Sequence, residues 1–259
     1  MPAASLNPTG TNQPGPSRPL ADRMRPKILS DFIGQPAVVG PGTALATAMA
    51  ADRLFSMILW GPPGCGKTTL AHIMASETQA HFVSFSAVLS GVKDIRAVIE
   101  VARSQRTEHG RRTLLFVDEI HRFNKSQQDA FLHHVESGLI TLVGATTENP
   151  SCEVIPARLS RCRVFVLEPL SEADLTQILQ NALSDTGSGL GQLGLAVGDD
   201  MIDHLVQNAD GDARRALNGL ELAADLLLET GKRRIDAVSY THLTLPTRSC
   251  QCRSRWSPD

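Results

Sequence analysis

The fold of this chain is decided by the stretch Gly61-Pro62-Pro63-Gly64-Cys65-Gly66-Lys67-Thr68. It fits G-x-x-x-x-G-K-[ST], a pattern whose glycines let backbone N–H groups close around phosphate oxygens. Residues 57–60 before it are apolar and predict a short buried strand, and residues 67–79 after it predict a helix. The N-terminus of that helix adds a partial positive charge where phosphates would lie. The succession of strand, loop and helix therefore predicts a phosphate-binding site.

Two side chains of this loop have specific expected roles. We expect Lys67 to reach the β- and γ-phosphates of ATP, and Thr68 to place a hydroxyl group on Mg²⁺. Thr69, the next residue, is included with the whole loop in the predicted nucleotide-binding set. The alternative interpretation is an ordinary Gly/Pro turn before a helix, which would bind nothing.

A second motif lies where another apolar run ends, at Asp118 and Glu119 after residues 113–117. A continuous apolar run suits a strand of a parallel sheet that is buried on both faces, and ligands bind at the carboxyl ends of such strands. We expect Asp118 to hold Mg²⁺, directly or through water, and Glu119 to orient and deprotonate the attacking water. The alternative for Glu119 is a helix-start residue favoured by the helix dipole. The Asp-Glu pair favours ATP hydrolysis.

The composition argues against several other classes of protein. The hydrophobic content of 42% supports a sizeable core, and the net charge of −2 gives no overall basic excess, so any DNA contact must come from a local basic surface. Five irregularly spaced cysteines form neither a zinc nor a disulfide pattern. We find no apolar run of membrane-spanning length and no secretion signal. We therefore expect a cytoplasmic protein, nucleoid-associated in a bacterium or nuclear in a eukaryote.

The order of predicted elements divides the chain into four parts. Residues 1–17 are rich in Pro, Ala, Ser, Thr, Asn and Gly and predict a disordered leader. Residues 18–169 alternate strand and helix, which predicts an α/β P-loop core with a parallel sheet flanked by helices. Residues 170–238 predict a small all-α lid domain. We interpret residues 239–259 as a non-native tail, because they lose the helical periodicity and resemble translated sequencing-adaptor read-through.

The individual elements follow from apolar patterns. Strands are predicted at residues 57–60, 81–86, 113–117, 140–146 and 163–167. Core helices are predicted at residues 67–79, 92–107 and 125–135. An N-cap sequence at Ser171–Asp174 begins the lid. Its helices are predicted at residues 172–184, 200–209 and 212–229, with a glycine-rich loop at 186–198.

Four further segments resemble elements of AAA+ ATPases. Thr141–Pro150 resembles the sensor-1 strand, whose polar residue touches the terminal phosphate or the attacking water. Thr146 fits this role best, and Thr147 is the alternative. Leu159–Cys162 resembles the Ser-Arg-Cys element of clamp-loader ATPases, whose arginine, here Arg161, enters a neighbouring subunit's site as a finger. A surface salt bridge is the alternative for Arg161.

The other two segments concern the nucleotide. Gly211–Asn218 resembles the sensor-2 helix of the lid, in which Arg214 would reach the bound triphosphate. The neighbouring Arg215 would face solvent. The segments 25–27 and 32–35 resemble the adenine-side segment of clamp loaders. That resemblance assigns nucleotide-binding roles to Arg25, Ile33 and Gly34.

The most specific resemblance is to the replication-associated recombination protein A family, whose eukaryotic relative is Werner helicase-interacting protein. It is carried by residues 121–132 together with 144–150, and it runs from about residue 18 to residue 238. His133 and Cys152 replace the proline and phenylalanine that are usual there, which affects local packing and not the chemistry. Family members continue into a helical C-terminal region that makes a tetramer. We therefore expect this chain to be a largely monomeric fragment of a homo-oligomer.

The resemblance implies a DNA-dependent AAA+ ATPase in replication-fork maintenance and recombination or repair. Its cofactors would be ATP and Mg²⁺. Its partners would be DNA and replication proteins, and it would not associate with a membrane. A clamp-loader subunit or a branch-migration motor is the alternative enzyme, although His-Arg-Phe-Asn at 121–124 argues against both. A non-hydrolysing nucleotide-binding scaffold is the alternative outside enzymes. Six basic residues are candidate DNA contacts: Lys93, Arg96, Arg103, Arg106, Arg122 and Lys125. The alternative is that these charged faces are only solvated, which is the usual case.

Overall fold

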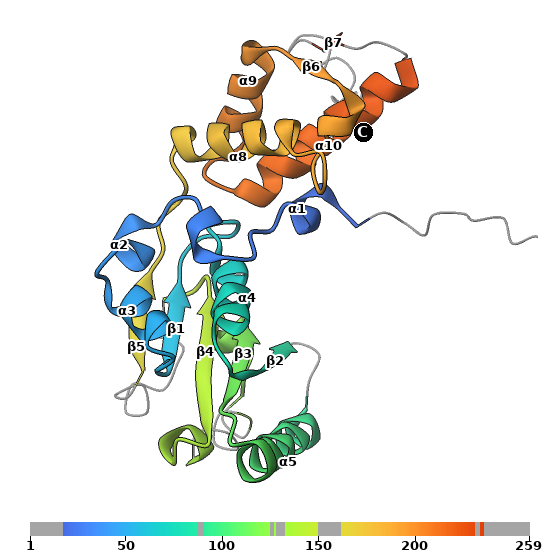
Figure 1. The fold of residues 1–259 in the computed structure, drawn as a ribbon. Helices are drawn as coiled ribbons and strands as arrows, with labels where there is room; N and C mark the ends of the chain where they lie inside the picture. Colours follow the sequence, from blue (N-terminus) through green and yellow to red (C-terminus); the bar gives the residue numbers. More distant parts are fainter. Residues whose placement is uncertain are drawn as a thin grey trace, which may run out of the picture.

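The apolar run that precedes the phosphate loop lies inside a five-stranded parallel sheet. The structure is a computed structural model that describes residues 18–86, 91–124, 127, 133–149, 162–230 and 234–235. The spatial order of the strands is β2-β3-β4-β1-β5 (Figure 1). Their bounds are Met57–Trp60 (β1), His81–Ser86 (β2), Thr113–Asp118 (β3), Ile140–Thr146 (β4) and Arg163–Val166 (β5). The five predicted strands and their parallel arrangement are confirmed, with one-residue differences at the ends of β3 and β5.

The register of the sheet aligns the carboxyl ends of its strands. Trp60 at the end of β1 lies opposite Thr146 at the end of β4. Ser86 at the end of β2 lies opposite Asp118 at the end of β3. Because all these strands run in the same direction, their last residues share one edge, which is where ligands bind in open α/β sheets.

Helices cover both faces of the sheet, as predicted. On one face, α4 (Lys67–Glu77) buries Leu70, Ile73 and Met74 in a cluster that includes Leu114 and Phe116 of β3. On the other face, α5 (Val92–His109) buries Ile95, Ile99 and Ala102 in a cluster that includes Leu115 and Val117 of β3. Alternate residues of β3 therefore serve opposite faces, as the two-residue period of a strand requires. Each fully buried aliphatic side chain contributes about 1.5–3 kcal/mol.

The second unit is a helical lid (Figure 1). It contains α8 (Glu172–Ser184), α9 (Asp199–Ala209) and α10 (Ala213–Thr230), which bury a common apolar cluster. The predicted cap is present: the Ser171 hydroxyl accepts a hydrogen bond from the Asp174 N–H, and the Asp174 carboxylate accepts one from the Ser171 N–H, each at 3.1 Å. The lid also contains a short parallel pair, β6 (Ala196–Val197) and β7 (Arg234–Ile235). Two-residue strands have too little periodicity to be predicted, so this pair was missed.

The N-terminal segment joins the two units. Its first helix, α1 (Leu20–Arg23), follows the predicted start of the core but packs against the lid, where Leu20 is fully buried. The Leu20 N–H donates to the Glu221 carboxylate of α10 at 2.9 Å. The segment continues through η1 (Leu29–Asp31), α2 (Pro36–Val39) and α3 (Ala44–Ala50) to β1. Residues 18–24 therefore contact the lid before the chain enters the core.

Several predictions concern residues outside the described ranges. These are the leader at 1–17, the tail at 239–259, most of the helix predicted at 125–135, and Arg161. Two short turns complete the described elements, η2 (Ile120–Arg122) and η4 (Gly191–Leu193). Within the described ranges, every helix is too short or too polar to cross a lipid bilayer.

Candidate nucleotide site

The predicted phosphate loop connects β1 to α4 and is enclosed by other segments. Gly64 and Gly66 have φ angles of +69° and +103°, a region that favours glycine. A Cβ atom on Gly66 would lie 2.7 Å from the ring of Phe32, and one on Gly64 would overlap the Asp212 carboxylate. These two glycines therefore allow the N-terminal segment and the lid to approach the loop closely.

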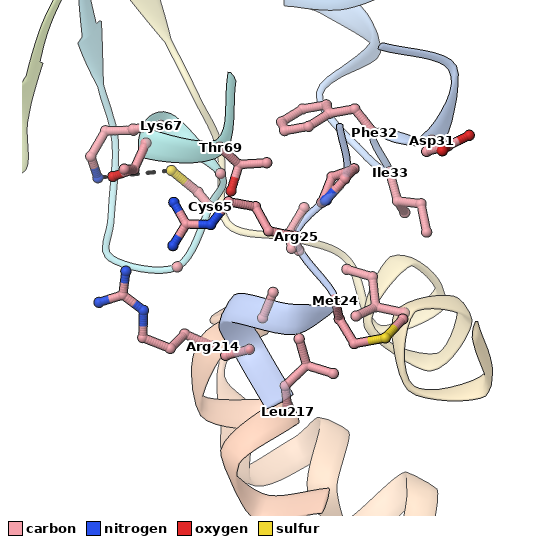
Figure 2. Close-up of a pocket in the computed structure, with 18 of the residues that line it drawn as sticks. Met24, Arg25, Asp31, Phe32, Ile33, Cys65, Lys67, Thr69, Arg214 and Leu217 are labelled. Atoms are coloured by element: carbon pink, nitrogen blue, oxygen red, sulfur yellow. Dashed lines mark hydrogen bonds between the residues drawn. The ribbon is translucent and has the colours of Figure 1, made fainter. Parts of the chain in front are cut away.

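Lys67 stands at the first position of α4, with its ammonium group inside the loop. The side chain is buried, and its Nζ donates to the carbonyls of Gly61 and Pro62 at 2.7 Å each. Cys65 Sγ lies 3.9 Å from the same nitrogen (Figure 2). Burial raises the pKa of the Cys65 thiol, although the neighbouring Lys67 opposes this effect. Cys65 is therefore an uncharged packing group at neutral pH, while Lys67 supplies the cation of the loop.

The two carboxylates stand where β3 leaves the sheet. Asp118 is the last residue of the strand, and its Oδ1 accepts a hydrogen bond from the Glu119 N–H at 3.1 Å. Glu119 has a φ angle of +51°, an unusual conformation for a residue with a side chain. The strand therefore ends at Asp118, and the chain turns at Glu119 into a short 3₁₀ segment at Ile120–Arg122. The side chain of Glu119 is 36% exposed, so its carboxylate is open to water.

Thr146 ends β4 beside these carboxylates. It is 1% exposed, and its Oγ1 accepts a hydrogen bond from the Glu148 N–H at 3.0 Å and donates to the Glu148 carbonyl at 3.2 Å. His121 Nδ1 lies 2.9 Å from Thr146 Oγ1 and 3.3 Å from Glu119 Oε2. Thr147 is half-buried, and its carbonyl accepts from the Trp60 ring N–H. Among the described contacts of these two threonines, only those of Thr146 lead through His121 to the Glu119 carboxylate.

The lid completes a pocket beside the loop. Figure 2 shows Arg25 and Arg214 directed toward the loop from the N-terminal segment and from α10. One part of the pocket is apolar and includes Phe32, Ile33 and Leu217. The pocket also contains loop residues Gly64 to Thr69, whose backbone N–H groups suit phosphate. An apolar part next to a cationic part fits a nucleoside triphosphate.

The donor set for Mg²⁺ is also present. Thr68 is the second residue of α4, and Asp118 ends β3, so a hydroxyl and a carboxylate oxygen are available at the carboxyl edge of the sheet. Oxygen ligands of this kind suit Mg²⁺, which is usually bound by one or two protein groups together with substrate phosphates. In the described part of the chain, no cluster of three or more His, Cys, Asp or Glu side chains could hold a metal by itself. The donors therefore fit a metal that arrives with a nucleotide.

Two contributors to the site were missed from the sequence. Gln35, at φ +58° and buried, donates to the Glu168 carbonyl at 2.6 Å and accepts from the Glu168 N–H at 3.0 Å. Glu168 lies between β5 and α8, so this pair ties the N-terminal segment to the core–lid connection. Asp212 accepts a hydrogen bond from the Arg215 N–H at 3.0 Å, and the Ala213 N–H donates to the Gly64 carbonyl at 3.3 Å. The start of α10 is thereby placed on the phosphate loop.

Other predicted residues lie outside this arrangement. Arg161 and Lys125 are not among the described residues. Gly34 has a φ angle of +82°, and the space beside its Cα is filled by Leu170, so it supports the core–lid junction. The remaining DNA candidates are exposed: Lys93, Arg96, Arg103 and Arg106 on α5, and Arg122 on η2. Arg103 forms an ion pair with Glu100 at 2.9 Å, and Arg106 donates to the Gly138 carbonyl at 3.1 Å.

Comparison with known proteins agrees with this geometry. Residues 57–170 match the sequence profile of the ATPase family associated with various cellular activities (AAA). Replication-associated recombination protein A of Coxiella burnetii is 55% identical over 215 residues, and the protein of the same name from Escherichia coli K12 is 52% identical over 218 residues. Each match covers 83% of this chain and 48% of the relative.

Over 83% of its length the chain is similar to members of the replication-associated recombination protein A family of AAA+ proteins. It spans about half the length of the curated relatives it matches. Among solved structures, RuvB of Thermotoga maritima, a Holliday junction branch migration motor, matches with a TM-score of 0.68 and 29% identity. That match covers 85% of this chain and 73% of the RuvB chain. The core and lid of this chain therefore share the α/β P-loop fold of RuvB.

Proposed function

We propose that this chain is the ATPase portion of a DNA-dependent AAA+ protein that acts in replication-fork maintenance and recombination or repair. The observation that carries the proposal is the convergence of the phosphate loop, Glu119 and Thr146 at one edge of the sheet, with Arg214 beside the loop. The similarity to replication-associated recombination proteins supports the DNA-related role. The role also implies a location with the chromosome, in the bacterial nucleoid or the eukaryotic nucleus.

The proposed reaction is hydrolysis of the terminal phosphoanhydride bond of ATP. Lys67 and the loop N–H groups hold the phosphates, and Arg25, Ile33 and Phe32 lie where the nucleoside would enter. Glu119 accepts a proton from water as the water oxygen bonds to the terminal phosphorus, and ADP leaves with the electrons of the broken P–O bond. Mg²⁺ held by Thr68 and Asp118 would neutralise phosphate charge. Thr146 orients the water or the terminal phosphate.

Assembly is the second part of the proposal. Arg161 acts as a finger in the site of a neighbouring copy, a contribution of roughly 10³–10⁵ in rate for arginine fingers. The chain spans about half the length of its relatives, and we assign assembly of the oligomer to the part that it does not cover. By mass action, isolated chains at low concentration then leave their interfaces mostly unformed. Contacts with DNA and with replication proteins belong to the assembled protein.

One alternative has a specific observation in its favour. The match to RuvB supports a branch-migration motor, and the clamp-loader-like segments support a loader subunit. Sequence identity favours the first proposal, because it reaches 55% with the replication-associated recombination protein of Coxiella burnetii and 29% with RuvB. A non-hydrolysing scaffold is disfavoured by the exposed carboxylate of Glu119 beside Thr146.

A turnover assay separates these possibilities. ATP hydrolysis should be measured with and without gapped and forked DNA, for the parent chain and for a version with the relatives' C-terminal region fused after residue 238. We expect slow hydrolysis by the parent and faster, DNA-stimulated hydrolysis by the fusion. Hydrolysis stimulated only by four-way junctions would favour the branch-migration motor. Tight ATP binding without turnover in either protein would favour the scaffold.

A further inference from the structure

His121 makes the most specific contact in the site that the proposed mechanism does not use. Its Nδ1 lies 2.9 Å from Thr146 Oγ1 and 3.3 Å from Glu119 Oε2. The imidazole is 13% exposed, whereas the carboxylate of Glu119 is 36% exposed. One ring nitrogen therefore stands between the base that would activate water and the threonine that would sense the terminal phosphate.

The hydrogen-bond partners of Thr146 fix the proton on that nitrogen. The Thr146 hydroxyl donates to the Glu148 carbonyl at 3.2 Å and accepts from the Glu148 N–H at 3.0 Å. A hydroxyl has one proton and two lone pairs, so one lone pair remains for His121. Without its own proton, Nδ1 would also turn a lone pair toward the negative Glu119 carboxylate. From these partners we assign hydrogen to Nδ1, which would share it between Thr146 and Glu119.

The backbone brings His121 close to Glu119. Glu119 occupies the left-handed region at φ +51°, where β3 turns into η2, and His121 lies within η2 two residues later. The Glu119 side chain has no other hydrogen bond or ion pair among the contacts described for this part of the chain. The one described contact of its side chain is with a ring that is 13% exposed and that also contacts Thr146 at the end of β4.

Resting on the proposed ATPase function, we propose that His121 is a positioning residue that couples Glu119 to Thr146. Whenever the hydroxyl of Thr146 shifts toward a terminal phosphate, the shared Nδ1–H moves with it, and the carboxylate of Glu119 is reoriented toward the water beside that phosphate. The chemistry of the reaction stays with Glu119. His121 determines whether its carboxylate is correctly placed.

The test exploits two amides that mimic different ring nitrogens. In His121→Asn the side-chain NH₂ can occupy the position of Nδ1–H, whereas in His121→Gln it extends toward the position of Nε2. Single-turnover hydrolysis should be measured with the protein in excess over radiolabelled ATP, together with ATP affinity from a fluorescent nucleotide analogue. An exposed histidine substituted in the same way, His109→Asn, serves as the matched control.

We expect His121→Gln and His121→Ala to lower the single-turnover rate by about tenfold to 100-fold, the cost of a misplaced catalytic group, with ATP affinity unchanged. His121→Asn should stay within about threefold of the parent, because the donor to Thr146 and Glu119 is kept. The effect of His121→Ala should shrink in a Thr146→Val background, since coupled residues are not additive. Equal losses in the Asn and Gln variants, or full additivity with Thr146→Val, would overturn the proposal.

A measurement independent of turnover tests the proton assignment. The ring ¹⁵N chemical shifts of His121 should show hydrogen on Nδ1, and a neutral ring with hydrogen only on Nε2 would overturn the proposal. Failure of the proposed role of His121 and failure of the proposed ATPase function give different results. If the parent hydrolyses ATP and His121→Ala matches its rate, only the role of His121 is wrong. If the parent binds ATP and never hydrolyses it, even when fused to the relatives' C-terminal region, the proposed function fails and the coupling fails with it.

Discussion

The two halves of the candidate site are held by different kinds of contact. On the core side, Glu119 directly follows β3 and Thr146 ends the neighbouring parallel strand β4, and His121 contacts both side chains. On the lid side, the contacts span much greater separations, such as 133 residues for Gln35–Glu168 and 201 for Leu20–Glu221. The core half is fixed by the sheet itself, whereas the lid half depends on how two units meet.

This difference suggests that the two halves of the site have different roles. Groups on a rigid sheet edge can hold the geometry that chemistry needs, so we expect the core half to set the rate of hydrolysis. Groups on the lid can approach or leave the loop, so we expect the lid half to adjust the nucleotide affinity that the phosphate loop provides, and to respond to the nucleotide state. The predictions below test this division, from the largest expected effect to the smallest.

The largest effect should come from Arg161→Ala in the assembled protein. ATP binding by isolated subunits should survive, while assembled turnover falls by roughly 10³-fold, because the finger acts in the neighbouring site. Mixing Arg161→Ala with Glu119→Gln subunits should restore part of the turnover, since some interfaces then combine an intact base with an intact finger. Steady-state ATPase assays across mixing ratios check this. The absence of rescue at every ratio would contradict a finger acting between subunits.

Lys67→Ala should weaken ATP binding by at least about 100-fold, or about 2.7 kcal/mol. The reason is that the loop would lose its only buried cation among the described residues, the one held by the Gly61 and Pro62 carbonyls. Equilibrium binding of a fluorescent ATP analogue measures the effect, with exposed Lys93→Ala as the control. A Lys67→Ala protein that binds ATP like the parent would show that the loop is not the phosphate site.

Arg214→Ala should weaken ATP binding by about tenfold, or about 1.4 kcal/mol, and leave the single-turnover rate at saturating ATP nearly unchanged. Its neighbour Arg215→Ala should have no effect on either quantity and is the matched control on the same helix. The two variants should be compared by the same fluorescent-analogue titration. A large loss of rate with unchanged affinity in Arg214→Ala would remove the distinction between the two halves.

The smallest effect on chemistry should come from Gln35→Ala. Loss of its two hydrogen bonds leaves the backbone N–H and carbonyl of Glu168 without these partners, which costs about 2 kcal/mol of unfolding free energy. Chemical denaturation monitored by circular dichroism measures this, with exposed Gln207→Ala as the control. Because the lid would be less firmly placed, ATP affinity should fall slightly. Unchanged stability would mean that Gln35 does not hold the core–lid connection.

The same division explains how much the sequence could predict. The loop from Gly61 to Thr68 and the carboxylates after β3 are local patterns, so strand order and strand ends could be predicted from spacing and apolar runs. The sequence could not predict that Gln35 pairs with Glu168 or that Leu20 is buried in the lid. No local signal identifies a partner so far along the chain. His121 lies in the family-like segment at residues 121–132, but its contact with Thr146 depends on the register of β3 against β4.

The measurement that tests the account most directly is a paired determination of ATP affinity and single-turnover rate for Glu119→Gln. The amide is isosteric with the carboxylate and cannot accept the proton of the attacking water. Exposed Glu229→Gln on α10 serves as the control. The account predicts an affinity within about threefold of the parent and a rate lowered by roughly 10²-fold or more. Hydrolysis at the parent rate would contradict the assignment of Glu119 as the base and, with it, the claim that the core half performs the chemistry.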